Sequence, residues 1–405
     1  MKIKMAPAIM VALLISVSLL GATVQLTPSS QPIPPTFFGM HFQTQYPWPS
    51  VPFGSWRLWS SLTEWPDIEP SKGTWRFDIL DKDVAMAQQH NAEVLFTLAV
   101  TPEWASAHPE VKSGWQKAGR TSEPLDMEDW RAFVRQVATR YKGRIHAYEI
   151  WNEPNLKQYW VGNTDQLVAQ VREAHDIIKG IDPSALIVSP SATGGPGIAW
   201  LDDFLHRGGA RYVDVIGYHF YVFPQPPEAM VDLIQKVKQT LANNGASDKP
   251  MWGTEQGWAG PKPFPSEEMG AAYIARAYTL SWATGVTRLY WYSWYDHKWV
   301  SLETTEADNQ TLKPAGRAYA IIQQWLTGAR MGSCNKGGDG TYACQLDRDG
   351  AREWIVWNVN GIKNFSLPSS WHATTVTPLL GQPQPVSGSN IQVGPTPQLL
   401  SESSR

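Results

Sequence analysis

The stretch IHAYEIWNEPN, residues 145–155, joins a run of β-forming residues to a cluster of polar ones. It is preceded by a segment whose apolar residues, from Trp130 to Tyr141, fall on one helical stripe. Before that segment lies a second β-rich run, EVLFTLAV (93–100). A strand, an amphipathic helix and another strand in this order form a βαβ unit, which pairs its strands in parallel. The stretch therefore predicts an α/β fold built on a parallel sheet.

The same alternation continues on both sides of this unit. Met230 to Leu241 form a second apolar helical stripe, and Ile321 to Trp325 suggest a closing helix. The first connection, TQYPWPSVPFG (44–54), holds too many prolines for a regular helix and should be a loop. Eight strand and helix units over about 300 residues predict a (β/α)8 TIM barrel. The candidate strands are 38–42, 55–59, 93–100, 145–151, 185–190, 213–221, 250–255 and 288–294.

The pattern changes beyond about Thr327, where short β-rich runs alternate with Gly, Pro and Asn turns. Such a pattern indicates a small all-β domain. We therefore expect a signal peptide over residues 1–24 and a linker or edge strand over 25–35. The barrel should occupy 36–330, followed by a C-terminal β-sandwich-like domain over 331–405.

The N-terminus follows the plan of a secretory signal peptide. Lys2 and Lys4 precede an apolar run, and small residues follow near Gly21 to Thr23. The alternative is a single membrane anchor, since the apolar run of roughly 16 residues is near the minimum for spanning a bilayer. We expect a secreted or periplasmic protein with no stable membrane insertion after the signal is cleaved.

Composition narrows the class of partner. Lys and Arg total 34 and Asp and Glu total 37, so the net charge is −3, without a long run of one sign. This balance disfavours a nucleic acid or an anionic membrane as partner. The 21 tryptophans supply rings that fill a core and also make platforms for sugar faces. An uncharged carbohydrate is the expected partner.

Other chemistries find little support in the sequence. It contains no G-x-S-x-G elbow, no G-x-x-x-x-G-K-[ST] loop and no H-E-x-x-H helix. The nine histidines are scattered, so neither a catalytic metal nor a cofactor is expected. In an exported protein, Cys334 and Cys344 favour a disulfide over a metal site or a reactive thiol.

Two glutamates are the strongest candidates for catalysis. Glu153 follows the fourth candidate strand, and Glu255 ends the seventh, in GTEQGW (253–258). The active site of such a barrel forms at the carboxyl ends of its strands. Two carboxylates there can flank a glycosidic bond, one as acid and one as nucleophile. The alternative is a pair of unrelated loop residues in salt bridges.

The neighbours of Glu153 favour the catalytic interpretation. Asn152 can donate to a sugar hydroxyl, and Pro154 has a fixed φ that stiffens the turn. Alternation along the strand points Glu149 into the barrel below the mouth. We interpret Glu149 as a buried structural carboxylate paired with a barrel base, with a third catalytic acid as the alternative.

Three further polar residues are expected around Glu255. His219 and Tyr221 share a face at the end of the sixth strand, where both could orient Glu255. A buried histidine satisfied by backbone is the alternative for His219. Arg57, on the second strand, would be costly to bury unpaired, so we expect it to pair with a carboxylate in the mouth. A merely structural pairing is also open.

With these residues in place, the sequence resembles clan A retaining glycoside hydrolases, and most closely glycoside hydrolase family 39. RYKGRIHAYEIWNEPN (140–155) resembles the family's fourth-strand block and GTEQGW its nucleophile block. The resemblance implies that Glu153 is the acid/base and Glu255 the nucleophile. It extends over residues 36 to 330, through EPSKGTWRFDILDKDVAMA (69–87), TPEWAS (101–106), YHFY (218–221) and TLKPAGRAYA (311–320).

The resemblance also implies where the sugar lies. Trp104, in TPEWAS, is expected to border the sugar site, and Asn152 to bind the sugar's 2-hydroxyl. One departure concerns Gln256, which stands after the nucleophile where the family often has an aromatic or aliphatic residue. This departure bears on the preferred sugar more than on the mechanism.

The expected reaction is a double displacement with the two carboxyls about 5 to 5.5 Å apart. On the eighth strand we expect Trp291 to be a stacking platform, with Trp294 as the alternative. The other residues expected to set sugar preference, each of which could equally be packing, are His41, Trp104, Gln256 and Trp258. Two other functions stay open, namely a family 5 type endoglycanase and a barrel that binds carbohydrate without catalysis.

Overall fold

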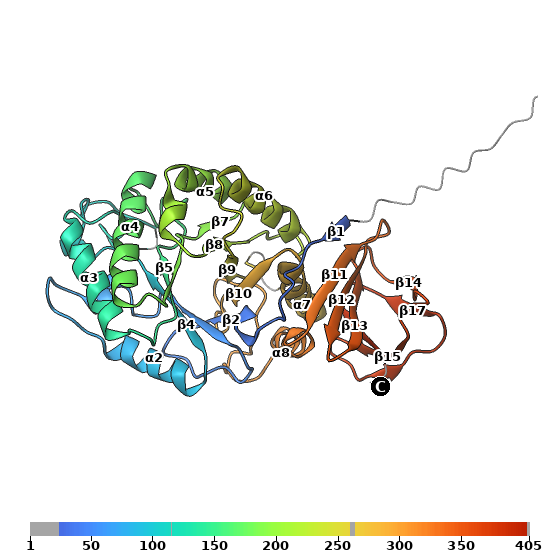
Figure 1. Ribbon diagram of the computed structural model, residues 1–405. Coiled ribbons are helices and arrows are strands. Elements are labelled where there is room, and N and C mark those ends of the chain that lie inside the picture. Colours follow the sequence, from blue (N-terminus) through green and yellow to red (C-terminus); the bar gives the residue numbers. More distant parts are fainter. Residues whose placement is uncertain (1–23, 115, 260–263, 403–405) are drawn as a thin grey trace, which may run out of the picture.

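The computed structural model describes residues 24–114, 116–259 and 264–402. It contains a parallel barrel ringed by helices and, beside it, a smaller unit of β-strands (Figure 1). The expected signal peptide falls almost entirely on residues 1–23, which lie outside the described residues. Among the described residues, no helix is long and apolar enough to cross a membrane.

The barrel contains all eight candidate strands, and the fifth is interrupted. The fifth strand is divided into β6, which pairs with β5, and β7, which pairs with β8. Between these two pieces Ser189 N donates to Val215 O at 2.9 Å, and this hydrogen bond closes the barrel. All pairs are parallel. The strands are β2 (Phe38–His41), β3 (Ser55–Leu58), β4 (Glu93–Leu98), β5 (Ala147–Ile150), β6 (Leu186–Val188), β7 (Ala192–Thr193), β8 (Ile216–His219), β9 (Met251–Gln256) and β10 (Val286–Trp291).

Helices cover the barrel with the faces that the sequence pattern indicates. In α3 the N-cap Asp126 accepts a hydrogen bond from Glu128 N, and the apolar stripe from Trp130 onward is buried. The first connection contains no regular helix, as the prolines predict. The helices are α1 (Trp65–Ile68), α2 (Asp78–Gln89), α3 (Met127–Arg140), α4 (Thr164–Ile181), α5 (Gly197–His206), α6 (Ala229–Asn243), α7 (Glu267–Ala283) and α8 (Pro314–Leu326).

The smaller unit consists of two antiparallel sheets. A seven-stranded sheet has the order β1-β11-β12-β13-β18-β15-β16, and β14 pairs with β17. Residues 24–26 form its edge strand beside β11, where Cys334 and Cys344 are joined by a disulfide across β11 and β12. The strands are β1 (Val24–Leu26), β11 (Arg330–Lys336), β12 (Thr341–Arg348), β13 (Ala351–Asn358), β14 (Lys363–Ser366), β15 (Ala373–Pro378), β16 (Gln384–Pro385), β17 (Asn390–Val393) and β18 (Gln398–Glu402).

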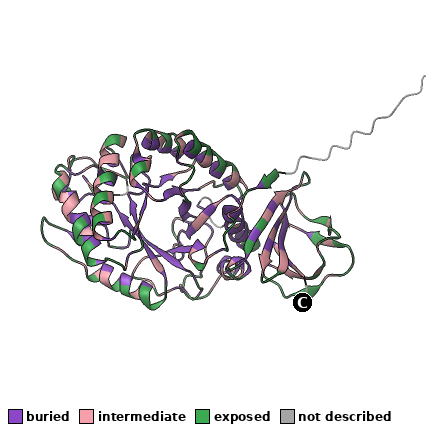
Figure 2. Ribbon diagram, viewed as in Figure 1, coloured by how far each residue is buried: buried purple, intermediate pink, exposed green. Residues whose placement is uncertain are grey.

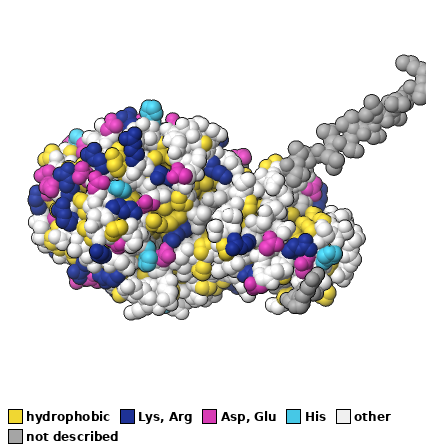
Figure 3. Space-filling model, viewed as in Figure 1, with side chains coloured by type: hydrophobic (Ala, Val, Ile, Leu, Met, Phe, Trp, Pro, Cys, Tyr) yellow, Lys and Arg dark blue, Asp and Glu magenta, His cyan; other side chains and the backbone are white. Residues whose placement is uncertain are grey.

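The buried residues concentrate in the barrel strands and in α7, which lies between the barrel and the β-unit (Figure 2). On the face in Figure 3, basic and acidic side chains are interspersed over the barrel. This mixture agrees with the net charge of −3.

A partly buried polar contact joins the barrel to the β-unit. The indole N–H of Trp357 donates to Glu228 Oε1 at 2.9 Å. Arg276, on α7, lies 3.3 Å from the same oxygen. Trp357 is on β13 and Glu228 immediately precedes α6, so this contact fixes the β-unit against two barrel helices. Tyr342 stacks on the Trp357 ring at 4.7 Å.

Replacing Trp357 by Phe should lower the free energy of unfolding by about 1.5 to 3 kcal/mol, because it keeps the stacked ring but removes a hydrogen bond to a charged group. Denaturant unfolding followed by circular dichroism measures the loss. The control is Trp200→Phe, since the described residues offer no hydrogen bond to that partly buried indole, which stacks on Phe204. Equal stability of the two variants would contradict the role of the Trp357 contact.

Candidate active site

Glu153 and Glu255 come together at the carboxyl ends of the barrel strands. Glu153 lies just past β5 and Glu255 is in β9. One oxygen of each carboxylate and one nitrogen of His219 all lie within 4.8 Å of one another. The two glutamates are only 8% and 6% exposed. This spacing is close to the separation of about 5 to 5.5 Å in retaining glycosidases and far from the wider spacing of inverting ones.

Both carboxylate oxygens of Glu255 accept hydrogen bonds from the barrel. Tyr221 Oη donates to Oε1 at 2.9 Å, and Arg57 Nη1 donates to Oε2 at 2.6 Å. Burial and the negative charge of Glu255 raise the pKa of Tyr221 well above its ordinary value, so its hydroxyl remains a donor at neutral pH. The cation and the hydroxyl stabilise a negative charge on Glu255 and fix its orientation.

His219 is not bonded to Glu255, although we expected it to orient that residue. Its Nδ1 lies 2.9 Å from Glu153 Oε1 and 3.9 Å from Glu255 Oε1. Arg57 and Tyr221 hold Glu255 instead, one on each carboxylate oxygen. Among the described residues, no hydrogen-bond partner lies beside His219 Nε2. The imidazole is therefore a neighbour of both carboxylates that bonds to Glu153.

A buried ion pair supports the two glutamates from below. Arg57 Nε donates to Glu149 Oε2 at 2.8 Å. Thr97 and Ser191 also donate to Glu149, at 2.7 and 2.5 Å. Burial by itself would raise the pKa of Glu149, but the charge of Arg57, aided by His219 and the two hydroxyls, lowers it below its ordinary value. Glu149 thus lies where strand alternation predicts, inside the barrel and paired with a base.

The Arg57 guanidinium also bonds to Asn152. Arg57 Nη2 donates to Asn152 Oδ1 at 2.7 Å. Because the amide oxygen is used in this way, the amide nitrogen of Asn152 is the group left to donate toward a ligand. Asn152 is 1% exposed, so its side chain is held in this orientation by the barrel.

The backbone after β5 is held in an unusual conformation. Trp151 and Glu153 have φ of 79° and 43°, in the left-handed region that residues other than glycine rarely adopt. Glu153 N donates to Ser191 O at 2.9 Å, which ties the turn to the neighbouring strand segment. Such conformations cost about 1 to 3 kcal/mol each and cluster at functional sites. Pro154 follows at once with its own fixed φ.

A cavity of about 730 Å³ opens above Glu153 and Glu255. One wall is an aromatic cluster centred on Trp299, whose ring meets those of Tyr221, Phe223 and Tyr292 edge to face at 5.7, 6.2 and 5.4 Å. Trp59 and Tyr159 also line the cavity. The sequence interpretation missed most of these rings. Tyr292 could have been found from the alternation along the eighth strand, whereas Trp299 lies in a loop without any periodic signal.

Trp291 is not the stacking platform that we expected. It is fully buried, stacks on Trp258 at 5.9 Å and lies near Tyr278 of α7. Its side chain therefore points out of the barrel toward the helix layer. The alternative, Trp294, is 1% exposed and does not line the cavity either. Tyr292, one alternation step from Trp291, faces the cavity instead.

Four other expected sugar contacts lie outside the lining of this cavity. Trp258 is buried, and its indole N–H donates to Gln225 O. Gln256, two residues earlier in the chain, is fully buried. Trp104 lines a different cavity. His41 donates from Nε2 to Trp59 O at 2.9 Å, so it supports a cavity residue from behind. Burial and the charge of Arg57 hold the pKa of His41 well below its ordinary value.

The acidic pair and His219 also form a set of donors that metals use. The neighbouring charges argue against a cation there. Arg57 brings a positive charge within 2.6 Å of Glu255, whose other oxygen is taken by Tyr221. The arrangement therefore suits proton transfer and nucleophilic attack better than metal binding.

A (β/α)8 barrel with two close glutamates after its fourth strand and in its seventh is the arrangement of the clan A glycoside hydrolases that the sequence resembles. Comparison with known families gives the more particular assignment. The sequence model of the family "Glycosyl hydrolases family 39" matches residues 70–293, more than half of the chain. The chain belongs to this family.

Individual relatives are distant. The sequence is 24% identical to a beta-xylosidase of Geobacillus stearothermophilus over 233 residues, 51% of this chain and 46% of that protein. The chain thus matches about half the length of this curated relative. The fold is similar to that of a family 39 beta-xylosidase from Caulobacter crescentus, with a TM-score of 0.67 and 16% identity over 95% and 98% of the two chains. A family 39 enzyme from Xanthomonas axonopodis pv. citri has a TM-score of 0.65 and 15% identity over 93% and 94%.

Replacing Glu149 by Gln should destabilise the protein by about 3 to 5 kcal/mol at neutral pH, because Arg57 loses a buried partner. The folded-state pKa of Glu149 lies below its ordinary value of 4.5. Its contribution to stability is therefore complete above that value and is lost as the pH falls through the folded-state pKa. The difference between wild type and variant should shrink below about pH 4.

Urea unfolding at several pH values measures this difference. The exposed Glu110→Gln serves as the matched control, since its side chain is 73% exposed. A difference between wild type and Glu149→Gln that stays constant from neutral to acidic pH would contradict the proposed origin of the stability.

Proposed function

We propose that this protein hydrolyses O-glycosidic bonds with retention of configuration, using Glu255 as nucleophile and Glu153 as acid/base. The observation that carries the proposal is the close approach of the two carboxylates, within 4.8 Å, at the carboxyl ends of the barrel strands. Membership of family 39 supports the same reaction class.

The surroundings of the two glutamates differ in the way that the two roles require. Glu255 is bonded to a cation and a hydroxyl, which stabilise the carboxylate that a nucleophile needs. Glu153 has no cation within ion-pair distance among the described residues other than His219, if that ring is protonated. Glu255 is thus the carboxylate with a permanent cation as partner, and Glu153 is the one without. The assignment of roles follows from this asymmetry.

The reaction proceeds in two displacements. Glu255 attacks the anomeric carbon while Glu153 passes its proton to the leaving oxygen, so that the glycosidic bond breaks and an ester to Glu255 forms. Glu153, now ionised, takes a proton from water, and the water oxygen attacks the same carbon and releases Glu255. Asn152 donates its amide N–H to the sugar's 2-hydroxyl, a contact that strengthens in the transition state. The aromatic wall around Trp299 provides faces for the sugar ring.

The substrate that the relatives suggest is a β-linked xyloside, since the Geobacillus and Caulobacter proteins are beta-xylosidases. The N-terminal pattern of Lys2, Lys4 and an apolar run supports secretion or export to the periplasm. The disulfide between Cys334 and Cys344 is compatible with an oxidising compartment.

Alanine substitution of each glutamate tests the assignment. With p-nitrophenyl β-xyloside as substrate, Glu255→Ala should lower kcat by about 10⁴-fold or more, because it removes the nucleophile. Glu153→Ala should lower kcat by about 10² to 10⁴-fold. Added azide should restore turnover in both, giving the glycosyl azide of inverted configuration with Glu255→Ala and of retained configuration with Glu153→Ala.

Product configuration followed by NMR distinguishes these outcomes. The wild type should first release the sugar anomer that matches the substrate. First release of the opposite anomer would exclude double displacement. Wild-type turnover by both alanine variants, with circular dichroism spectra unchanged, would refute the catalytic assignment altogether.

Replacing Tyr221 by Phe should lower kcat by about tenfold, since one of the two hydrogen bonds to Glu255 is lost while the ring remains. KM for an aryl xyloside should change less than kcat, because the lost contact acts on the nucleophile. The control is Tyr212→Phe, a partly buried tyrosine outside the cavity. A Tyr221 variant with unchanged kcat would show that Arg57 alone suffices to position Glu255.

A further inference from the structure

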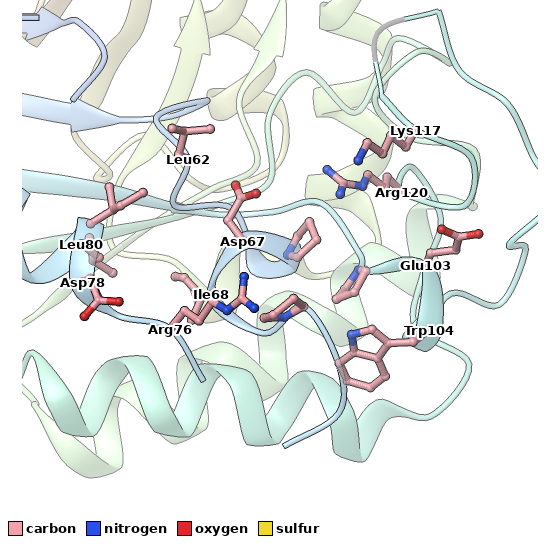
Figure 4. A pocket seen from close by; sticks show the side chains of 14 residues that line it. Leu62, Asp67, Ile68, Arg76, Asp78, Leu80, Glu103, Trp104, Lys117 and Arg120 are labelled. Atoms are coloured by element: carbon pink, nitrogen blue, oxygen red, sulfur yellow. The ribbon is translucent and has the colours of Figure 1, made fainter. Parts of the chain in front are cut away.

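A second cavity, of about 750 Å³, lies at the same end of the barrel as the glutamates. Its walls come from the connections that follow β3 and β4, so it opens beside the carboxyl ends of these strands. Figure 4 shows its side chains, with Trp104 on one side and Arg76 near the centre. Neither Glu153 nor Glu255 is among its lining residues. The proposed hydrolysis leaves this cavity without a role.

The charged groups that line the second cavity balance one another. They are Arg76, Lys117 and Arg120 on the basic side and Asp67, Asp78 and Glu103 on the acidic side. In the part of the chain that the structure describes, none of the three cations forms an ion pair. The cavity therefore offers donors and acceptors that are still available to a ligand.

This balance selects a class of ligand. A phosphate or another compact anion would be attracted by three cations but repelled by three carboxylates in the same walls. A sugar hydroxyl both donates and accepts a hydrogen bond, so a neutral polyhydroxylated ligand can use the donors and the acceptors together. The charge pattern thus favours a neutral carbohydrate.

The cavity also has an ordered aromatic wall. Trp104 is partly exposed, and its indole N–H donates to Glu69 O at 3.0 Å. Trp65 meets it edge to face at 6.1 Å, and Pro66 and Pro102 line the cavity nearby. An indole fixed by a hydrogen bond and a second ring is a rigid surface for the apolar face of a sugar.

One loop separates the two cavities. Ser60 lines the cavity above the glutamates and Leu62 lines the second one. Two residues of chain span at most about 7 Å, so the walls are immediate neighbours. Leu62 is 57% exposed. A ligand made of several linked sugars would cross this loop and occupy both cavities.

We propose that the cavity beside Trp104 is a distal subsite for a neutral oligosaccharide whose reacting end lies at Glu153 and Glu255. This inference rests on the proposed glycosidase function and adds that an extended chain is bound better than a disaccharide or a small glycoside. Trp104 then binds sugar, as the family resemblance implies, but at a distance from the catalytic pair.

The double variant Arg76→Ala/Lys117→Ala tests the subsite with little risk to the fold, because both side chains are exposed and unpaired among the described residues. For linear β-1,4-xylohexaose, kcat/KM should fall about tenfold, which corresponds to about 1.4 kcal/mol of lost binding. For p-nitrophenyl β-xyloside, which is too short to reach the subsite, kcat/KM should stay unchanged. Trp104→Ala should act in the same direction.

Arg135→Ala is the matched control, since Arg135 is an exposed cation on α3 outside this cavity. The proposal is overturned if the double variant changes kcat/KM for both substrates by the same factor, or for neither. If the wild type cleaves neither substrate, the proposed hydrolysis fails and calorimetry with xylohexaose decides the subsite separately. Binding weakened about tenfold in the double variant supports it, whereas equal binding, or no binding to the wild type, overturns it.

Discussion

The site depends on the buried guanidinium of Arg57. A charge removed from water is costly unless it is paired and its hydrogen bonds are satisfied. Arg57 meets this requirement with three partners, Glu149 and Asn152 in and just past β5 and Glu255 in β9, donating to them at 2.8, 2.7 and 2.6 Å. Because the planar guanidinium is rigid, fixing it to Glu149 also fixes the directions from which it meets the other two.

Because of this ion pair, Glu255 and Glu153 have different surroundings. Two carboxylates, Glu149 and Glu255, share one cation, whereas Glu153 is bonded to His219. Glu153 is instead positioned by its backbone, through a left-handed φ of 43° and a hydrogen bond to Ser191 O. Glu255 is thus positioned by its ion pair with Arg57, and Glu153 by its backbone conformation. That difference underlies the roles assigned to them.

Sequence reasoning recovered what depends on periodicity. Strand alternation pointed Glu149 into the barrel below the mouth, and the helical stripes located α3 and α6, because burial imposes periods of two and 3.6 residues. It failed where one residue of register or the path of a loop decides. Trp291 and Tyr292 exchange faces with a single-residue shift, and β10 is irregular beside β9 at this point. The partner of His219 depends on the distance of its ring from two carboxylates at the ends of other strands, which no periodicity encodes.

Loop paths decide the remaining specificity, and here the two cavities differ in kind. The cavity above the glutamates has the aromatic cluster of Trp299, Tyr221, Phe223 and Tyr292, whose rings are held edge to face. The cavity beside Trp104 combines one indole with exposed charges of both signs. Rigid aromatic walls hold a reacting ring with precision, since they lose little conformational freedom, whereas long charged side chains adapt to variable parts of a ligand. The strands therefore fix the chemistry, and the connection after β3 sets how much of a chain ligand the protein can hold.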